Sequence, residues 1–281
     1  MNKVYICDSD DINLEASLDG GQAFRWWGDK EKYRGVIRDN VYIISKENSS
    51  IYIENLTSEI NNKSLSELKV YLGLNFNLKK FTNHYKEQNY IYKLILSNQG
   101  LRILHQDPWE ATISFITSSV SNVLKIKNNI NKLSSIAGNK IGEGMNDYTF
   151  PTAKKIFELG ESELRKIGFG FRSPYIIDAA YKNMKNQIDF QKLREIEYEK
   201  CLNKLLEVKG IGKKVADCIM AYGLGRRDVF PVDRWVRRGL VNRLKYKNIY
   251  TNEKLSDLAR IKFKNDSAYI QQYIFYGEKT S

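Results

Sequence analysis

The sequence is poor in the residues that build metal centres and disulfide frameworks. Its 281 residues include three cysteines, two histidines and four prolines. Cys7, Cys201 and Cys218 lie far apart and are odd in number, which argues against a disulfide framework. An iron–sulfur cluster needs four cysteine ligands, and two histidines argue against a catalytic zinc site. We therefore expect chemistry carried out by side chains alone, with no metal and no cofactor.

Long apolar runs are also missing. No stretch approaches the ~20 apolar residues of a membrane-spanning helix. The first ten residues carry Asp8 and Asp10 and no sustained apolar run, so they do not resemble a signal peptide. We expect an intracellular protein with no membrane partner, cytoplasmic and nucleoid-associated if its source is bacterial.

Basic residues are in clear excess. The chain has 45 lysines and arginines against 33 aspartates and glutamates, which gives a formal net charge of +12. Such an excess predicts a polyanionic partner, because neutralising phosphates releases condensed counterions. A nucleic acid fits this prediction, and an anionic membrane surface is the alternative.

The hydrophobic pattern changes near residue 100. Before it, Tyr33–Ile37, Val41–Lys46 and Ile51–Glu54 are rich in Tyr, Val and Ile and are separated by turn residues, which predicts an antiparallel meander. One helix is expected near Ser64–Leu72. Later helices are expected from Pro108 and over 153–159, 162–167, 175–184, 195–206, 213–222 and 266–276. We predict an α+β fold with a β-rich domain over residues 1–100 and a helical domain over 101–281.

A glycine-containing hairpin is predicted between the helix expected over 195–206 and the helix expected over 213–222. Segment 208–214 reads VKGIGKK. Its two glycines permit a tight reversal, and the N–H groups that open the following helix form a phosphate-sized anion site. In this helix–hairpin–helix interpretation, the residues that contact DNA are Lys209, Gly210, Gly212 and Lys213. A glycine cap in a helical bundle explains the glycines equally well.

Lys214 and Asp233 favour the functional interpretation. Lys214 lies in the first turn after the hairpin, where its amine is a candidate nucleophile. Asp233 follows Pro231 and begins the next helix as a capping carboxylate. Such a group can stabilise the positive charge that builds on a sugar as its base departs. A surface lysine and an ordinary helix cap explain either residue alone, but the pair is harder to explain in that way.

The motifs together resemble the helix–hairpin–helix, Gly/Pro-rich, aspartate superfamily of DNA glycosylases. The superfamily pattern spans 207–218 and 230–238, and Lys214 marks members that also cleave the strand. Within the superfamily the chain resembles 8-oxoguanine DNA glycosylases, through segments 20–26, 105–108, 114–116, 168–172, 215–218 and 269–275. The absence of cluster cysteines argues against the endonuclease III and adenine-glycosylase branches.

The resemblance implies a fold, an activity and a partner. It implies an N-terminal antiparallel sheet domain, like that of the TATA-binding protein, followed by an all-α catalytic domain. It implies a monomeric bifunctional glycosylase and AP lyase that excises 8-oxoguanine from double-stranded DNA. In that activity the base is flipped out, Lys214 attacks C1′, and a Schiff base leads to β-elimination. Asp233 supports the amine and the cationic transition state.

The resemblance also implies a base pocket. The N7 of 8-oxoguanine carries a proton, so a carbonyl, which only accepts, separates it from guanine. The Gly21 carbonyl is the implied discriminator. Cys218 and Phe275 are implied to sandwich the base, and Gln271 to bond its Watson–Crick edge. Taken singly, Cys218 and Phe275 are more often plain core residues.

Recognition of the opposite base departs from the eukaryotic relatives. Phe171 is the implied wedge in the duplex, although a buried loop aromatic is the alternative. It stands where those relatives carry a tyrosine, and segment 118–122 lacks their row of asparagines. Asn122 and Arg172 remain as readers of the opposite base, so we predict a relaxed opposite-base preference.

Two other functions compete with this interpretation. One is a glycosylase for another damaged purine, such as an alkylated one, although monofunctional enzymes of that kind typically lack the hairpin lysine. The other is a non-catalytic helix–hairpin–helix DNA-binding module. Such a module needs the glycines and the basic charge but not Lys214 paired with Asp233.

Overall fold

The computed structural model describes residues 3–280 and has an α+β fold, as predicted. An antiparallel sheet of five strands has the order β1-β5-β4-β3-β2. Its strands are β1 Val4–Asp8, β2 Trp26–Gly28, β3 Lys32–Ile37, β4 Asn40–Glu47 and β5 Ser50–Asn55. The predicted meander corresponds to β3, β4 and β5, and buried and partly buried residues alternate regularly along β5.

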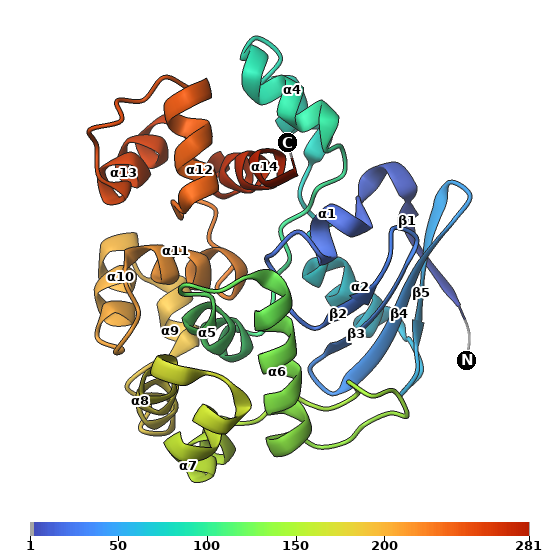
Figure 1. Ribbon diagram of the computed structural model, residues 1–281. Helices are drawn as coiled ribbons and strands as arrows, with labels where there is room; N and C mark the ends of the chain where they lie inside the picture. Colours follow the sequence, from blue (N-terminus) through green and yellow to red (C-terminus); the bar gives the residue numbers. More distant parts are fainter. Residues whose placement is uncertain (1–2, 281) are drawn as a thin grey trace.

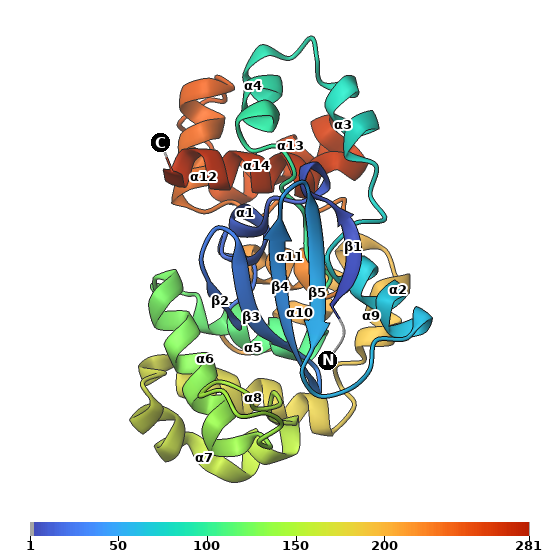
Figure 2. The same cartoon turned by 90° about the vertical axis from the view of Figure 1, so that its right-hand side faces the viewer.

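Helices make up most of the remaining chain. They are α1 Leu14–Leu18, α2 Asn62–Tyr71, α3 Leu78–His84, α4 Asn89–Ser97, α5 Pro108–Thr117, α6 Val123–Ala137, α7 Ala153–Ile167, α8 Ser173–Met184, α9 Phe190–Glu195, α10 Tyr198–Leu206, α11 Lys213–Tyr222, α12 Arg234–Arg238, α13 Asn252–Phe263 and α14 Ser267–Thr280. The sheet lies at one side of the molecule, and α11 lies in the middle of the helical part (Figure 1). After a quarter turn the sheet stands in front of α10 and α11 (Figure 2). No helix within residues 3–280 is both long and apolar enough to cross a membrane.

Two hydrophobic clusters hold these elements together. One lies between the sheet and α2 and includes Trp26, Ile44, Ile53 and Leu72. The other joins the helices on which the candidate site stands, and it also contains residues of α3 and α4, such as Phe81. The α5–α11 pair belongs to this second cluster, so α11 is held by apolar contacts along its length. The division of the chain at residue 100 stays a prediction.

Several predicted element boundaries were wrong. We expected one helix in the first hundred residues, but α1, α3 and α4 also form there; each is short, so its apolar period is weak. The helix expected over 195–206 begins three residues later, as α10 at Tyr198, because the chain is extended at Ile196 and Glu195 ends the separate helix α9. Helix α6 was not predicted, although Ile126, Ile130 and Leu133 show the helical period. The predicted break near residue 160 is present as a kink at Gly160, whose φ is 80°.

Candidate active site on helix α11

The hairpin before α11 has the geometry that its glycines allow. Gly210 has a φ of +79°, and a Cβ there would collide with the ring of Tyr175. Gly212 is the N-cap of α11 and supplies no side-chain acceptor to the first turn. The N–H groups that open α11 therefore have no capping side chain, which suits an anion. Lys209 is exposed beside them, and its backbone N–H donates to Asp178.

The two lysines that open α11 point to different neighbours. The Lys214 amine lies 3.4 Å from the Ser118 hydroxyl at the end of α5 and 6.0 Å from the centre of the Phe115 ring. The Lys213 amine lies 2.5 Å from the Tyr198 hydroxyl of α10 and 3.2 Å from an Asp257 oxygen of α13. Only the first amine faces α5, so the two lysines have different surroundings.

Cys218 lies one turn after Lys214 and is buried. Burial raises the pKa of its thiol to about 11, while the charge of Lys214 and a hydrogen bond from it act in the opposite direction. The charge of Asp233 also raises this pKa. Lys214 and Asp233 are therefore both close enough to one thiol to affect it, although no ion pair joins them within the part of the chain that the structure describes.

Asp233 is the N-cap of α12, as expected. One of its oxygens accepts from the backbone N–H groups of Trp235 at 3.0 Å and Val236 at 2.9 Å. The same oxygen thus satisfies two donors at the helix start. The second carboxylate oxygen makes no hydrogen bond to a described residue, so it is available to another partner.

Tyr222 extends the Lys214 face of α11 and was not predicted as a site residue. Its hydroxyl lies 2.6 Å from Gln272 Oε1 and 3.3 Å from Gln271 Oε1, which links α11 to α14. Its ring stacks on Phe115 with centroids 5.2 Å apart. The spacing of eight residues from Lys214 was the available signal, because residues four apart share a helix face. Gln271 is buried at this junction.

Gly21 and Phe275 are far apart in the sequence but lie against each other in the structure. Gly21 has a φ of +93°, and a Cβ there would stand 3.3 Å from the Phe275 ring. Phe275 is half-buried on α14, one turn after Gln271. The structure thus brings Gly21 and the predicted stacking ring into one place, and a side chain at residue 21 would press on that ring.

The predicted wedge stands on a tight loop between α7 and α8. Phe171 is 51% exposed, which leaves its ring free to contact another molecule. Arg172 is buried, and its guanidinium donates to the carbonyl groups of Ser119 and Val120. Asn122 is exposed, and its side-chain oxygen caps α6 by accepting from Lys125. Arg172 therefore joins the wedge loop to segment 118–122, and it would have to leave these carbonyls to reach DNA.

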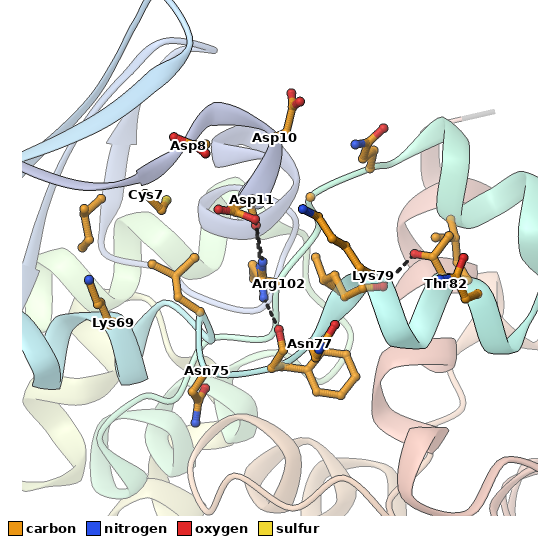
Figure 3. A pocket seen from close by; sticks show the side chains of 18 of the residues that line it. Cys7, Asp8, Asp10, Asp11, Lys69, Asn75, Asn77, Lys79, Thr82 and Arg102 are labelled. Carbon is orange, nitrogen blue, oxygen red and sulfur yellow. Dashed lines mark hydrogen bonds and ion pairs between the residues drawn. The ribbon is translucent and has the colours of Figure 1, made fainter.

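The hollow beside Lys214 is small. It has a volume of about 20 Å³ and is lined by Lys213, Lys214, Asp217, Val232, Asn252, Glu253 and Ser256. A hollow of about 970 Å³ lies elsewhere, between the first strand and helices α3 and α4 (Figure 3). Its labelled side chains include Asp11 and Arg102, which form an ion pair of 3.9 Å. None of the predicted catalytic or base-binding residues lines it, so size alone does not locate the candidate site.

Comparisons with known proteins identify the family of this chain. Residues 4–112 match the family described as the N-terminal domain of 8-oxoguanine DNA glycosylase. An N-glycosylase/DNA lyase of Saccharomyces cerevisiae is 33% identical over 267 residues, which cover 85% of this chain and 68% of that protein. The chain belongs to the 8-oxoguanine DNA glycosylase/lyase family.

This family member is also similar to solved structures, two of which contain DNA. MBOgg1, in complex with a low-affinity DNA ligand, has a TM-score of 0.92 and 31% identity, covering 100% of this chain and 96% of that one. The Clostridium acetobutylicum 8-oxoguanine glycosylase/lyase, bound to double-stranded DNA with cytosine opposite 8-oxoguanine, has a TM-score of 0.90 and 29% identity, covering 96% and 92%. A 3-methyladenine DNA glycosylase from Archaeoglobus fulgidus is 19% identical with a TM-score of 0.79, which shows a shared fold alone.

Proposed function

We propose that this protein is a DNA glycosylase and AP lyase that removes 8-oxoguanine from double-stranded DNA, with Lys214 as its nucleophile. The observation that carries the proposal is the Lys214 amine in the first turn of α11, beside the Cys218 thiol and the Ser118 hydroxyl. An amine that attacks a sugar carbon must lie at the edge of a base-sized site. Membership of the glycosylase/lyase family supports that location.

The reaction follows from these groups. The nitrogen lone pair of the Lys214 amine forms a bond to C1′ while the glycosidic bond breaks, and the base leaves with the electron pair and takes a proton. Loss of a proton from nitrogen and opening of the sugar ring give a Schiff base. The Schiff base acidifies C2′, whose proton is lost as the 3′ phosphate leaves. Asp233, with one oxygen free of backbone donors, stabilises the positive charge on the sugar.

The pocket residues have distinct roles in this proposal. The Gly21 carbonyl accepts from the N7 proton of the lesion, and the Phe275 ring, already against Gly21, stacks on the flipped base. Cys218 packs on the other side of the base, and Gln271 bonds its edge. Phe171 fills the space that the base leaves in the duplex.

The hairpin and the wedge loop hold the DNA. The uncapped N–H groups of α11 bind one phosphate, with Gly210 and Gly212 shaping the turn and Lys209 adding charge. Lys213 contributes from the start of the same helix, although its amine is directed inward in this structure. The enzyme acts as a monomer on double-stranded DNA.

Borohydride trapping tests the proposal. The protein is incubated with duplex DNA containing 8-oxoguanine and with sodium borohydride, which reduces a Schiff base to a stable covalent link. We expect a covalent complex with the wild-type protein and none with Lys214→Gln, while both bind the duplex. Lys63→Gln, an exposed lysine in the first turn of α2, is the matched control and should trap normally.

The outcomes separate the competing functions. Trapping that survives Lys214→Gln would falsify the assignment of the nucleophile. Release of an alkylated purine but not of 8-oxoguanine would identify a glycosylase for another lesion. Salt-dependent DNA binding with no base release would identify a non-catalytic binding module.

A further inference from the structure

The face of α11 that carries Lys213 contains a buried acid that the proposed reaction does not use. Asp217 lies four residues after Lys213 and three after Lys214, and it is 0% exposed. A buried carboxylate is costly to desolvate unless its oxygens are well satisfied. An apolar residue would join the surrounding helices at a lower cost. Packing alone therefore does not explain why an acidic residue occupies this position.

Both oxygens of Asp217 are occupied by neighbouring helices. The Tyr198 hydroxyl of α10 donates to one oxygen at 2.8 Å, and the Ser256 hydroxyl of α13 donates to the other at 3.3 Å. The carboxylate thus ties three helices to one point, and it fixes the direction of the Tyr198 hydroxyl proton. With that proton directed at Asp217, the hydroxyl oxygen is free to accept.

Lys213 is the group that uses the free lone pair. Its amine donates to the Tyr198 hydroxyl at 2.5 Å and forms an ion pair with Asp257 at 3.2 Å. The guanidinium of Arg260, on α13, lies 3.1 Å from the centre of the Tyr198 ring. The side chain of Lys213 is 16% exposed as a result. Lys213 is therefore held between α10 and α13, on the side away from Ser118.

We propose that Asp217 and Tyr198 are positioning residues that hold Lys213 against α10 and α13, so that Lys214 alone of the two adjacent lysines reaches the sugar. This inference rests on the proposed function, in which one lysine amine attacks C1′. Two amines at the start of one helix could both attack the same electrophile. The hydrogen bonds from Lys213 to Tyr198 and from Tyr198 to Asp217 prevent this by holding the Lys213 amine away from the sugar.

Tyr198→Phe tests this positioning of Lys213, because it removes the hydroxyl and keeps the ring on which Arg260 lies. The reduced covalent complex is digested, and mass spectrometry identifies the lysine that carries the sugar. We expect the wild type to carry it on Lys214 alone. In Tyr198→Phe, loss of a hydrogen bond to a charged group should raise the released fraction of Lys213 by about tenfold, so part of the product should be found on Lys213.

A gain-of-function variant guards against misfolding. Lys214→Gln should give no trapping, whereas Lys214→Gln combined with Tyr198→Phe should trap slowly through Lys213. A misfolded protein cannot gain trapping at a new residue. The matched control is Tyr85→Phe, which removes a tyrosine–carboxylate hydrogen bond of 3.2 Å to Asp266 at a distant place. It should change neither the rate nor the trapped residue.

The proposed function and the positioning role fail in different ways. If the wild type forms no covalent complex, the proposed function fails. The positioning role is overturned by a different set of results. In these results the wild type traps through Lys214, and Tyr198→Phe traps at the same residue and at the same rate. The double variant is folded and binds DNA but does not trap.

Discussion

The two faces of α11 carry similar residues in different hydrogen-bonding environments. On one face, Lys214, Cys218 and Tyr222 follow each other at intervals of four, and the Lys214 amine has two weak partners, the Ser118 hydroxyl at 3.4 Å and the Cys218 thiol. On the other face, Lys213 and Asp217 are four apart, and their polar atoms are bonded to α10 and α13. The first face leaves its amine available, and the second fixes its amine in place.

In the proposed mechanism, the reactivity of each lysine therefore depends on how many hydrogen bonds its amine already makes. Both lysines stand at the same helix end, so the helix dipole cannot distinguish them. The hydrogen bonds that each amine already makes do distinguish them. The same holds for Asp233, because one oxygen caps α12 and the other remains available.

The largest effect on the reactive face is expected for Asp233→Asn. Asparagine caps a helix about as well as aspartate, so stability should change little, whereas the charge near the sugar is lost. We expect single-turnover excision of 8-oxoguanine to slow by about 10²–10³-fold. Asp189→Asn, at the N-cap of α9, is the control and should leave excision unchanged. Full activity of Asp233→Asn would remove the carboxylate from the mechanism.

On the fixed face, Asp217→Asn should alter how stability depends on pH. Burial raises the pKa of Asp217 from 3.8 to about 6, against the opposing effect of Lys213. Its folded form therefore holds the proton more tightly, so the stability from this group is present below pH 4 and is lost as the pH rises to about 6. The variant has no such loss.

Urea unfolding of both proteins between pH 4 and pH 7 measures this effect. The difference in unfolding free energy should move in favour of Asp217→Asn by about 1–3 kcal/mol over that range. A difference that stays constant with pH would show that the carboxylate is ionised in the folded protein throughout.

Gly21→Ala tests the wall opposite the reactive face. Alanine at a positive φ costs about 1–2 kcal/mol, and here its Cβ would also press on Phe275. Gly160→Ala is the matched control, since Gly160 has a φ of +80° and a Cβ there would meet nothing within 4 Å. Both variants should lose stability in urea unfolding, but only Gly21→Ala should lose excision activity. Equal activity in the two variants would place the base elsewhere.

The smallest effect concerns the base opposite the lesion. Arg172 already donates to three carbonyl groups, and Phe171 offers no side-chain hydrogen bond. A good bidentate contact contributes about 1–3 kcal/mol of discrimination, and few candidates remain to provide one. Excision rates opposite cytosine and opposite adenine should therefore be comparable in single-turnover assays. A strong preference for cytosine would show that Asn122 or Arg172 rearranges to read it.

Local signals predicted the parts of the site that depend on neighbouring residues. The bounds of α11 and the capping position of Asp233 were predicted because glycines, a proline and an aspartate mark them within a few residues. The α+β fold was predicted from the strand and helix periods. Helix α6 could have been predicted from its own apolar period.

Long-range contacts could not be predicted in this way. The direction of Lys213 depends on Tyr198 and Asp257, which belong to other helices. The contact of Tyr222 with Gln271 and Gln272 depends on how α14 crosses α11. Arg172 was predicted as a base reader, and its burial against segment 118–122 follows from loop packing that no local pattern encodes.

A crystal structure of Lys214→Gln bound to a duplex with 8-oxoguanine opposite cytosine tests the central claim most directly. We expect the lesion outside the duplex, between Cys218 and Phe275, with C1′ on the order of 3–4 Å from the residue 214 side chain. A lesion that remains stacked in the duplex, or that lies in the hollow of Figure 3, would contradict the account.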